Sequence, residues 1–93
     1  MYFIVVYDIN TISKGGAKRL RKIFKTMKKY LIHIQRSVFE GELSKAQYEN
    51  LKVEVGKIID KKLDSVIYFK SREIRWLEKH LQGIKENKTD YIV

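Results

Sequence analysis

The sequence predicts a small α+β domain in which two helices cover one face of an antiparallel sheet. Two observations lead to this fold class. Runs of aromatic and β-branched residues alternate with two longer stretches of helical periodicity, in the order strand, helix, strand, strand, helix, strand. The 93 residues are enough for one such domain and for little more. We therefore expect a single domain over residues 1–93.

The first strand is expected at residues 2–8, where a run of aromatic and β-branched side chains ends before the polar Asn10. A helix is expected over residues 14–30, with Ser13 as its N-cap. Apolar residues recur along this helix at helical spacing, so one of its faces should pack on the sheet. These residues are Ala17, Leu20, Ile23, Phe24, Met27 and Leu31.

A β-hairpin is expected next. Two strand-like runs, residues 31–35 and 38–43, flank the polar pair Arg36 and Ser37. The hairpin requires a tight turn at this pair. A single bent strand over the same residues is the alternative, and the sequence alone leaves it open.

The second helix has a clear start. Ser44 is followed three residues later by Gln47, the spacing of a capping box, and Leu43 and Tyr48 stand where a hydrophobic staple is found. The helix should run from residue 45 to about Asp60. Its inward residues are expected to be Tyr48, Leu51, Val55, Ile58 and Ile59.

The last strand of the sheet is expected at residues 64–70. A short segment at residues 74–77 and a brief extra strand at residues 80–82 should follow. From about residue 83 to residue 93 the chain is polar and then apolar, which indicates an extended C-terminal tail. The order β-α-β-β-α-β with a short extra strand is the ferredoxin-like arrangement.

Two strands are apolar on both faces instead of alternating. Residues 2–7 and 66–69 contain no charged side chain, and a continuous apolar strand indicates that both faces of a sheet are covered. The helices cover one face only. The simplest cover for the other face is a second copy of the chain, with the two sheets packed face to face in a homodimer. Half-exposed rings at Tyr2 and Tyr68 are the alternative.

The net charge of +9, from 20 Lys and Arg against 11 Asp and Glu, indicates a polyanionic partner. Nucleic acid is the first candidate and an anionic membrane surface is the rival. No apolar run approaches the roughly 18 residues of a spanning helix, which argues against the membrane. The chain has no cysteine and no signal-peptide pattern, so we expect a cytoplasmic protein.

The positive charge is concentrated in and around the first helix, because no acid occurs between Ile9 and Phe39. We expect this helix to bind the phosphate backbone of a nucleic acid, with an ordinary solvated face as the alternative. The pair Gly15 and Gly16 would let a phosphate approach the first N–H groups of the helix. The basic positions are Lys14, Lys18, Arg19, Arg21, Lys22, Lys25, Lys28, Lys29 and Arg36.

Asp8 ends the apolar first strand and is the candidate metal ligand. Mg²⁺ keeps several waters and needs only one or two protein carboxylates, and two copies of Asp8 at a two-fold axis would supply them. Such an ion could activate water for attack on a phosphodiester. The alternative is structural, because an aspartate that leaves a strand commonly accepts hydrogen bonds from the N–H groups of the next turn.

The sequence resembles the CRISPR-associated protein 2 family. The resemblance rests on three blocks with the spacing of that family: residues 5–9 (VVYDI), residues 35–43 (QRSVFEGEL) and residues 64–66 (DSV). It covers nearly the whole chain. His33 departs from the pattern, since some members carry an arginine there, and this puts one phosphate contact in doubt.

The resemblance implies a ferredoxin-like homodimer with metal-dependent endonuclease activity on single-stranded RNA or double-stranded DNA. It implies that Asp8 and its symmetry mate are the catalytic ligands of Mg²⁺, and that Tyr7 is associated with catalysis. Charge and resemblance together give the expected nucleic-acid-binding residues, which are Lys14, Lys18, Arg19, Arg21, Lys22, Arg36 and Phe39.

The resemblance also implies a role in spacer acquisition beside the integrase, CRISPR-associated protein 1. A non-catalytic DNA-binding scaffold of the integration complex is the alternative function. In that role the basic residues matter more than Asp8. The C-terminal segment Tyr91–Val93 would contact the integrase by adding a strand to a neighbouring edge, or it is a frayed tail.

Overall fold

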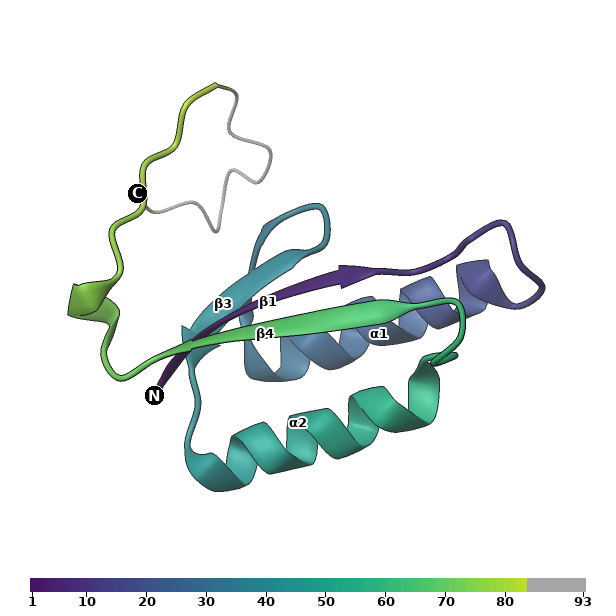
Figure 1. Cartoon of the computed structure of the whole chain (residues 1–93), viewed down its shortest axis with the longest axis horizontal. Coiled ribbons are helices and arrows are strands. Elements are labelled where there is room, and N and C mark those ends of the chain that lie inside the picture. Colours follow the sequence, from purple (N-terminus) through teal and green to yellow (C-terminus); the bar gives the residue numbers. More distant parts are fainter. Residues whose placement is uncertain (84–93) are drawn as a thin grey trace.

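A computed structural model describes residues 1–83 of the chain (Figure 1). Four strands form one antiparallel sheet in the order β2-β3-β1-β4. Both helices lie on the same face of this sheet (Figure 1). The expected ferredoxin-like α+β arrangement is therefore confirmed. The elements are β1 (Tyr2–Asp8), α1 (Gly16–Tyr30), β2 (Ile32–Gln35), β3 (Val38–Glu42), α2 (Lys45–Ile58) and β4 (Ser65–Ser71).

The core lies between the sheet and the helices. Alternate residues of β1 point into it, and Phe3, Val5 and Tyr7 are at most 4% exposed. Phe39 of β3 is wholly buried beside them. Both helices contribute the apolar faces that the sequence predicts, except that Ala17 is exposed. The helical core residues are Leu20, Ile23, Phe24 and Met27 from α1 and Tyr48, Leu51, Val55 and Ile58 from α2, with Leu31 and Ile59 directly after the two helices.

The start of α1 differs from the expectation. The N-cap is Gly15, not Ser13, and no side chain caps the helix. Gly15 has φ 79°, in the left-handed region that glycine adopts without strain. A Cβ on Gly16 would lie 2.2 Å from the carbonyl oxygen of Asn10. The space beside the Cα of Gly16 is thus filled by the chain's own backbone, and the expected approach of a phosphate to the first N–H groups of the helix stays a prediction.

The start of α2 is as predicted. The backbone N–H of Gln47 donates to Ser44 Oγ at 3.1 Å, and Ser44 N–H donates to Gln47 Oε1 at 2.8 Å. This capping box satisfies two of the N–H groups that have no partner within a helix.

The β2–β3 segment is a hairpin, which settles the alternative of a bent strand. Its turn contains Arg36, whose φ of 38° lies in the left-handed region. The ring of His33 donates from Nε2 to the backbone carbonyl oxygen of Arg36 at 2.8 Å. The ring therefore holds the turn, although Arg36 is neither glycine nor asparagine, the residues that adopt this conformation readily.

The C-terminal part follows a different path from the one expected. A short 3₁₀-helix at Ile74–Trp76 follows β4, but residues 80–82 form no strand. The segment crosses the face of the sheet away from the helices, where Lys79 pairs with the buried Glu40 of β3. A side-chain contact of this kind provides no backbone ladder, so no strand results. The expected tail beyond residue 83, including Tyr91–Val93, lies outside the described residues.

The face of the sheet away from the helices, here called the open face, is largely apolar. Across β1 and β4 it presents Ile4 opposite Phe69 and Val6 opposite Ile67. Phe69 and Ile67 are 55% and 51% exposed. The continuous apolar strands thus occur because the second face is also apolar, and the described residues leave Ile67 and Phe69 on it half exposed. Among the described residues no helix is long and apolar enough to cross a bilayer.

The carboxylate of Asp64 joins three segments of the fold. It lies just before β4, its side chain is 0% exposed, and it accepts hydrogen bonds from Arg19 Nε at 2.8 Å and Nη2 at 3.3 Å. The backbone N–H of Asn10 donates to it at 2.9 Å and that of Asp60 at 2.8 Å. The loop after β1, the first turns of α1 and the loop before β4 are thereby fastened together.

We expect Asp64→Asn to lower the free energy of unfolding at neutral pH by about 1–3 kcal/mol, because an amide nitrogen would then face N–H donors. Burial raises the pKa of Asp64, but hydrogen bonds from Arg19 and from backbone N–H groups outweigh it and leave the pKa below its usual value. The stability that this shift supplies is present above about pH 4 and is lost as the pH falls through the lowered pKa.

Chemical denaturation measured from pH 7 down to pH 2 tests this, with Glu49→Gln as the control for an exposed carboxylate. The wild type should lose more stability on acidification than Asp64→Asn does. Parallel acid profiles for these two proteins would contradict the assignment.

Candidate nucleic-acid interface and metal-ligand position

Asp8 stands at the edge of the open face. It is the last residue of β1, its side chain is exposed, and it lies opposite Ser65 of β4. Alternation along β1 places it on the same face as Ile4 and Val6. Its carboxylate makes no hydrogen bond or ion pair with the described residues.

The structural alternative for Asp8 belongs to another residue. The side-chain oxygen of Asn10 accepts hydrogen bonds from the N–H groups of Ile12 and Ser13, each at 3.1 Å, and this holds the turn after β1. Asp8 has no part in that turn. An exposed carboxylate that the fold does not use is available to a ligand.

The donor set at Asp8 is that of a hard cation, but it is small. A carboxylate oxygen suits Mg²⁺, which binds through one or two carboxylates and several waters. Within residues 1–83 no three His, Asp or Glu side chains gather at a position that could hold a metal. One chain therefore supplies one protein ligand at Asp8, and a site there would need further oxygens from a second copy or from a substrate.

Tyr7 lies on the other face of the sheet from Asp8, because neighbouring residues of a strand point to opposite sides. It is 4% exposed, and its ring stacks on Phe39 with a centroid separation of 6.0 Å. Burial raises the pKa of its hydroxyl group, and a hydrogen bond with Ser37 offsets part of that rise. The fold thus separates the two residues that the resemblance joins as a catalytic pair.

The structure gives two of the expected nucleic-acid-binding residues a packing role. Phe39 is 0% exposed, and its ring contacts Phe24 and His33 at centroid separations of 5.5 Å and 4.7 Å, so it offers no surface to a ligand. The guanidinium of Arg19 binds Asp64, and its side chain is 15% exposed. Direct contact with a nucleic acid by Phe39 does not fit its burial.

The remaining basic residues of the expected set are exposed along α1 and at the hairpin turn. They are Lys14, Lys18, Arg21, Lys22 and Arg36. Arg21 and Arg36 come from different elements, and both line a hollow of about 520 Å³ beside Tyr7 and Phe24. Aromatic walls under a basic rim are typical of surfaces that bind single-stranded nucleic acid.

Asp64 is the residue whose role the sequence reasoning missed. Its neighbours gave a signal, because an acid at the start of an apolar strand, in a chain whose first helix is strongly basic, invites a buried ion pair. From the sequence alone, however, every basic residue of that helix was an equally good candidate partner for Asp64.

Comparison with models of protein families identifies the family of this chain. The model described as CRISPR associated protein Cas2 matches residues 1–80. The chain belongs to the Cas2 family. Two Cas2 relatives and one solved Cas2 structure show how far the similarity extends.

A relative from Fusobacterium nucleatum, named CRISPR-associated endoribonuclease Cas2, is 56% identical over 90 residues, which are 97% of this chain and 84% of the relative. A relative of the same name from Thermotoga maritima is 40% identical over 92 residues, 99% of each chain. The crystal structure of Streptococcus pyogenes Cas2 at pH 6.5 matches with a TM-score of 0.75 and 32% identity, over 88% of this chain and 100% of that one. The family resemblance is therefore confirmed.

We expect Arg36→Gly to stabilise this Cas2 chain while weakening its binding of RNA. A left-handed backbone destabilises a non-glycine residue by roughly 1–2 kcal/mol, and glycine removes this strain. The greater conformational freedom of glycine in the unfolded chain offsets roughly 0.5–1 kcal/mol of that gain. The midpoint of chemical denaturation should rise slightly, while the affinity for a single-stranded RNA oligonucleotide falls. Unchanged affinity would show that Arg36 does not contact the RNA. Lys45→Gly, at the first position of α2, is the control for the loss of one positive charge elsewhere on the surface.

Proposed function

We propose that this chain is a metal-dependent endoribonuclease that acts as a homodimer in CRISPR spacer acquisition. The observation that carries the proposal is the exposed carboxylate of Asp8, which has no partner within residues 1–83 and lies at the border of a partly exposed apolar face, in a chain of the Cas2 family. The names of the relatives, CRISPR-associated endoribonuclease Cas2, support the reaction class.

The open face supports the homodimer. Ile32, Ile67 and Phe69 are each more than half exposed on it, and apolar patches of this kind mark interaction surfaces. A two-fold axis through this face would pack two sheets against each other, as the apolar strands predict. It would also bring two copies of Asp8 to one interface, so that the dimer would supply two carboxylate ligands where a single chain supplies one.

In the proposed site, Asp8 from each copy would hold Mg²⁺ through carboxylate oxygens. The ion would supply Lewis-acid stabilisation of the charge that develops on a phosphodiester during hydrolysis. The chain itself contributes position, because Asp8 pairs with Ser65 of β4 at the end of a strand that β3 and β4 flank as far as Val6. Tyr7 acts from the opposite face as a positioning residue that packs under this end of β1.

The exposed basic residues would hold the RNA backbone. Lys14, Lys18 and Lys22 offer ammonium groups along α1, and Arg21 with Arg36 offers guanidinium groups around the hollow beside Phe24. Phosphate contacts of this type position a strand without reading its sequence. Arg19 contributes indirectly, since its bond to Asp64 fixes the start of α1.

A second candidate function is a non-catalytic DNA-binding scaffold in complex with the integrase, CRISPR-associated protein 1. It is favoured by the single carboxylate per chain at Asp8 and by the absence of a three-ligand cluster from residues 1–83. In that case the basic residues of α1 carry the function and Asp8 is dispensable.

Asp8→Asn should reduce the cleavage of single-stranded RNA in Mg²⁺ by roughly 100-fold or more, since an amide is a poor ligand for a hard cation. The exposed position predicts unchanged stability, within about 0.5 kcal/mol of the wild type. Cleavage of labelled RNA and of duplex DNA is measured with Mg²⁺ and with chelator, and RNA affinity is measured in parallel.

Glu49→Gln, which removes an exposed carboxylate from α2, is the matched control and should cut as the wild type does. If Asp8→Asn cuts normally, the active site lies elsewhere. If neither the wild type nor Asp8→Asn cuts, but both bind duplex DNA with strong salt dependence, the non-catalytic scaffold is the function of this chain.

A further inference from the structure

Ser65 is the cross-strand neighbour of Asp8 on the open face. It is the first residue of β4, it is exposed, and the register of β1 and β4 sets it directly opposite Asp8. Opposite residues of an antiparallel pair project from the same face of the sheet, with Cβ atoms about 4.5–5.5 Å apart. The next residue of β4, Val66, packs against the core on the other face, as alternation requires. A hydroxyl group and a carboxylate therefore share this end of the open face.

The hydroxyl group of Ser65 has no structural use within residues 1–83, because it makes no hydrogen bond with the described residues. Ser71, at the other end of β4, shows the contrast, since its Oγ donates to the backbone carbonyl oxygen of Glu73 at 3.0 Å. Between the two serines, the open-face positions of β4 are the apolar Ile67 and Phe69. Ser65 is thus a polar side chain whose hydrogen-bonding groups are available to a ligand.

The position of Ser65 relative to Asp8 is fixed from both directions along the strands. On one side, the pairing of β1 with β4 continues from this pair to the other end of the two strands. On the other side, the backbone N–H of Asn10 donates at 2.9 Å to the carboxylate of Asp64, which directly precedes Ser65. The exit of β1 and the entry to β4 are therefore joined on both sides of the pair. A site on positions held in this way needs little ordering when a ligand binds.

The chemistry of this pair suits a hydrated hard cation. Mg²⁺ keeps several of its waters when a protein carboxylate binds it, and those waters need hydrogen-bond acceptors of their own. A serine hydroxyl group has two acceptor lone pairs and one donor proton. It can therefore accept a hydrogen bond from a bound water and donate one to a carboxylate oxygen. Removing a group that orients metal ligands in this way typically costs about 10–100-fold in metal affinity.

We propose that Ser65 is a positioning residue of the cation site at Asp8. Its hydroxyl group accepts a hydrogen bond from a water of the hydrated ion and keeps the carboxylate of Asp8 oriented toward that ion. The inference rests on the metal site of the proposed function and adds one residue per copy to it. The two copies of the homodimer would together offer two carboxylates and two hydroxyl groups.

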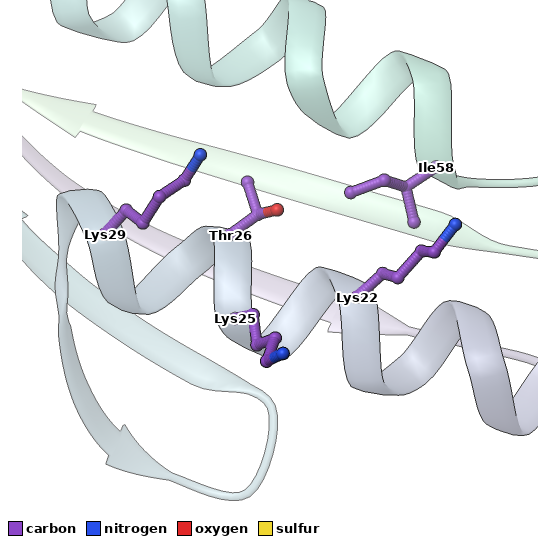
Figure 2. Close-up of a pocket in the computed structure, with 5 residues that line it drawn as sticks. All are labelled: Lys22, Lys25, Thr26, Lys29 and Ile58. Carbon is purple, nitrogen blue, oxygen red and sulfur yellow. The ribbon is translucent and has the colours of Figure 1, made fainter.

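The helical layer is a poor competitor for the cation. Figure 2 shows Lys22 and Lys29 extending from α1 toward α2. Ammonium groups repel a divalent ion, and the carboxylate of Glu54 on α2 already lies 2.5 Å from Lys29 Nζ. Cation binding by the whole chain therefore does not report on this groove, which has a volume of about 530 Å³ and is lined by Lys22, Lys25, Thr26, Lys29 and Ile58.

Binding of Mn²⁺ alone tests the role of Ser65 independently of cleavage, because Mn²⁺ prefers the same oxygen ligands as Mg²⁺ and is detected by electron paramagnetic resonance. Ser65→Val and Ser65→Thr are nearly equal in shape, and only the second keeps a hydroxyl group. Ser65→Val should weaken Mn²⁺ binding by about 10–100-fold, whereas Ser65→Thr should bind as the wild type does. Ser65→Ala, which removes the hydroxyl group without adding a branch, should match Ser65→Val.

Ser71→Ala removes a hydroxyl group from the other end of β4 and is the matched control, which should bind Mn²⁺ as the wild type does. Chemical denaturation checks that every variant is folded. Cleavage of single-stranded RNA adds a second measurement. The Mg²⁺ concentration that gives half-maximal cleavage should rise for Ser65→Val with little change in the maximal rate, whereas damage to the fold would lower the maximal rate.

The outcomes separate this inference from the proposed function. If all three variants of Ser65 bind Mn²⁺ as the wild type does while Asp8→Asn binds it weakly, Ser65 has no role and the proposed metal site stands. If Ser65→Thr loses as much affinity as Ser65→Val, the hydroxyl group is not the cause and the inference is again overturned. If the wild type binds no Mn²⁺, or Asp8→Asn binds it as tightly as the wild type, the metal site at Asp8 fails and the inference fails with it.

Discussion

The buried carboxylate of Asp64 is the interaction on which the arrangement of this molecule depends. Burying a charged group is costly unless hydrogen bonds replace its water, and here four donors from Arg19, Asn10 and Asp60 do so. Because these donors come from three different segments, satisfying one charge fixes the exit of β1, the start of α1 and the entry to β4 together. The basic helix is therefore presented at a defined place, and Asp8, two residues before Asn10, is held at the edge of the sheet.

The alternation of β1 then divides the functional residues between two sides. The helical layer carries the long basic stretch of α1, whereas the open face carries Asp8, Glu40 and Glu42. Glu40 is partly neutralised by Lys79, and it also accepts a hydrogen bond from Tyr2, whose pKa is raised to about 12, first by burial and then by this carboxylate. The open face is thus less basic than the helical layer, although Glu42 is also paired with the N-terminal ammonium group. In the proposed function, a cation at Asp8 would offset the remaining negative charge for a phosphodiester that approaches this face.

Local signals predicted the elements well where the sequence alone determines the geometry. The aromatic and β-branched run gave β1 its observed bounds, and the capping box gave the first residue of α2. Two features that the sequence did not predict depend on contacts across the fold or across a loop. Ser13 is a good N-cap by composition, but the close approach of Asn10 to Gly16 moves the start of α1. Arg19 stands among exposed basic residues in the sequence, and only the fold brings Asp64, 45 positions later, against it.

In the proposed function, dimerisation through the open face and cation binding at Asp8 are energetically linked. If a second copy covers Ile67 and Phe69, water leaves the neighbourhood of Asp8, and two like charges approach across the axis. With less water to screen them, the two carboxylates repel each other more strongly, so closure of the apolar face is opposed until a cation offsets their charge. By mass action, a divalent ion that binds only the closed arrangement would strengthen the association of the two copies. The position of Asp8 at the border of an apolar surface, and not within a polar cleft, is what makes dimerisation and metal binding one coupled equilibrium in the proposed function.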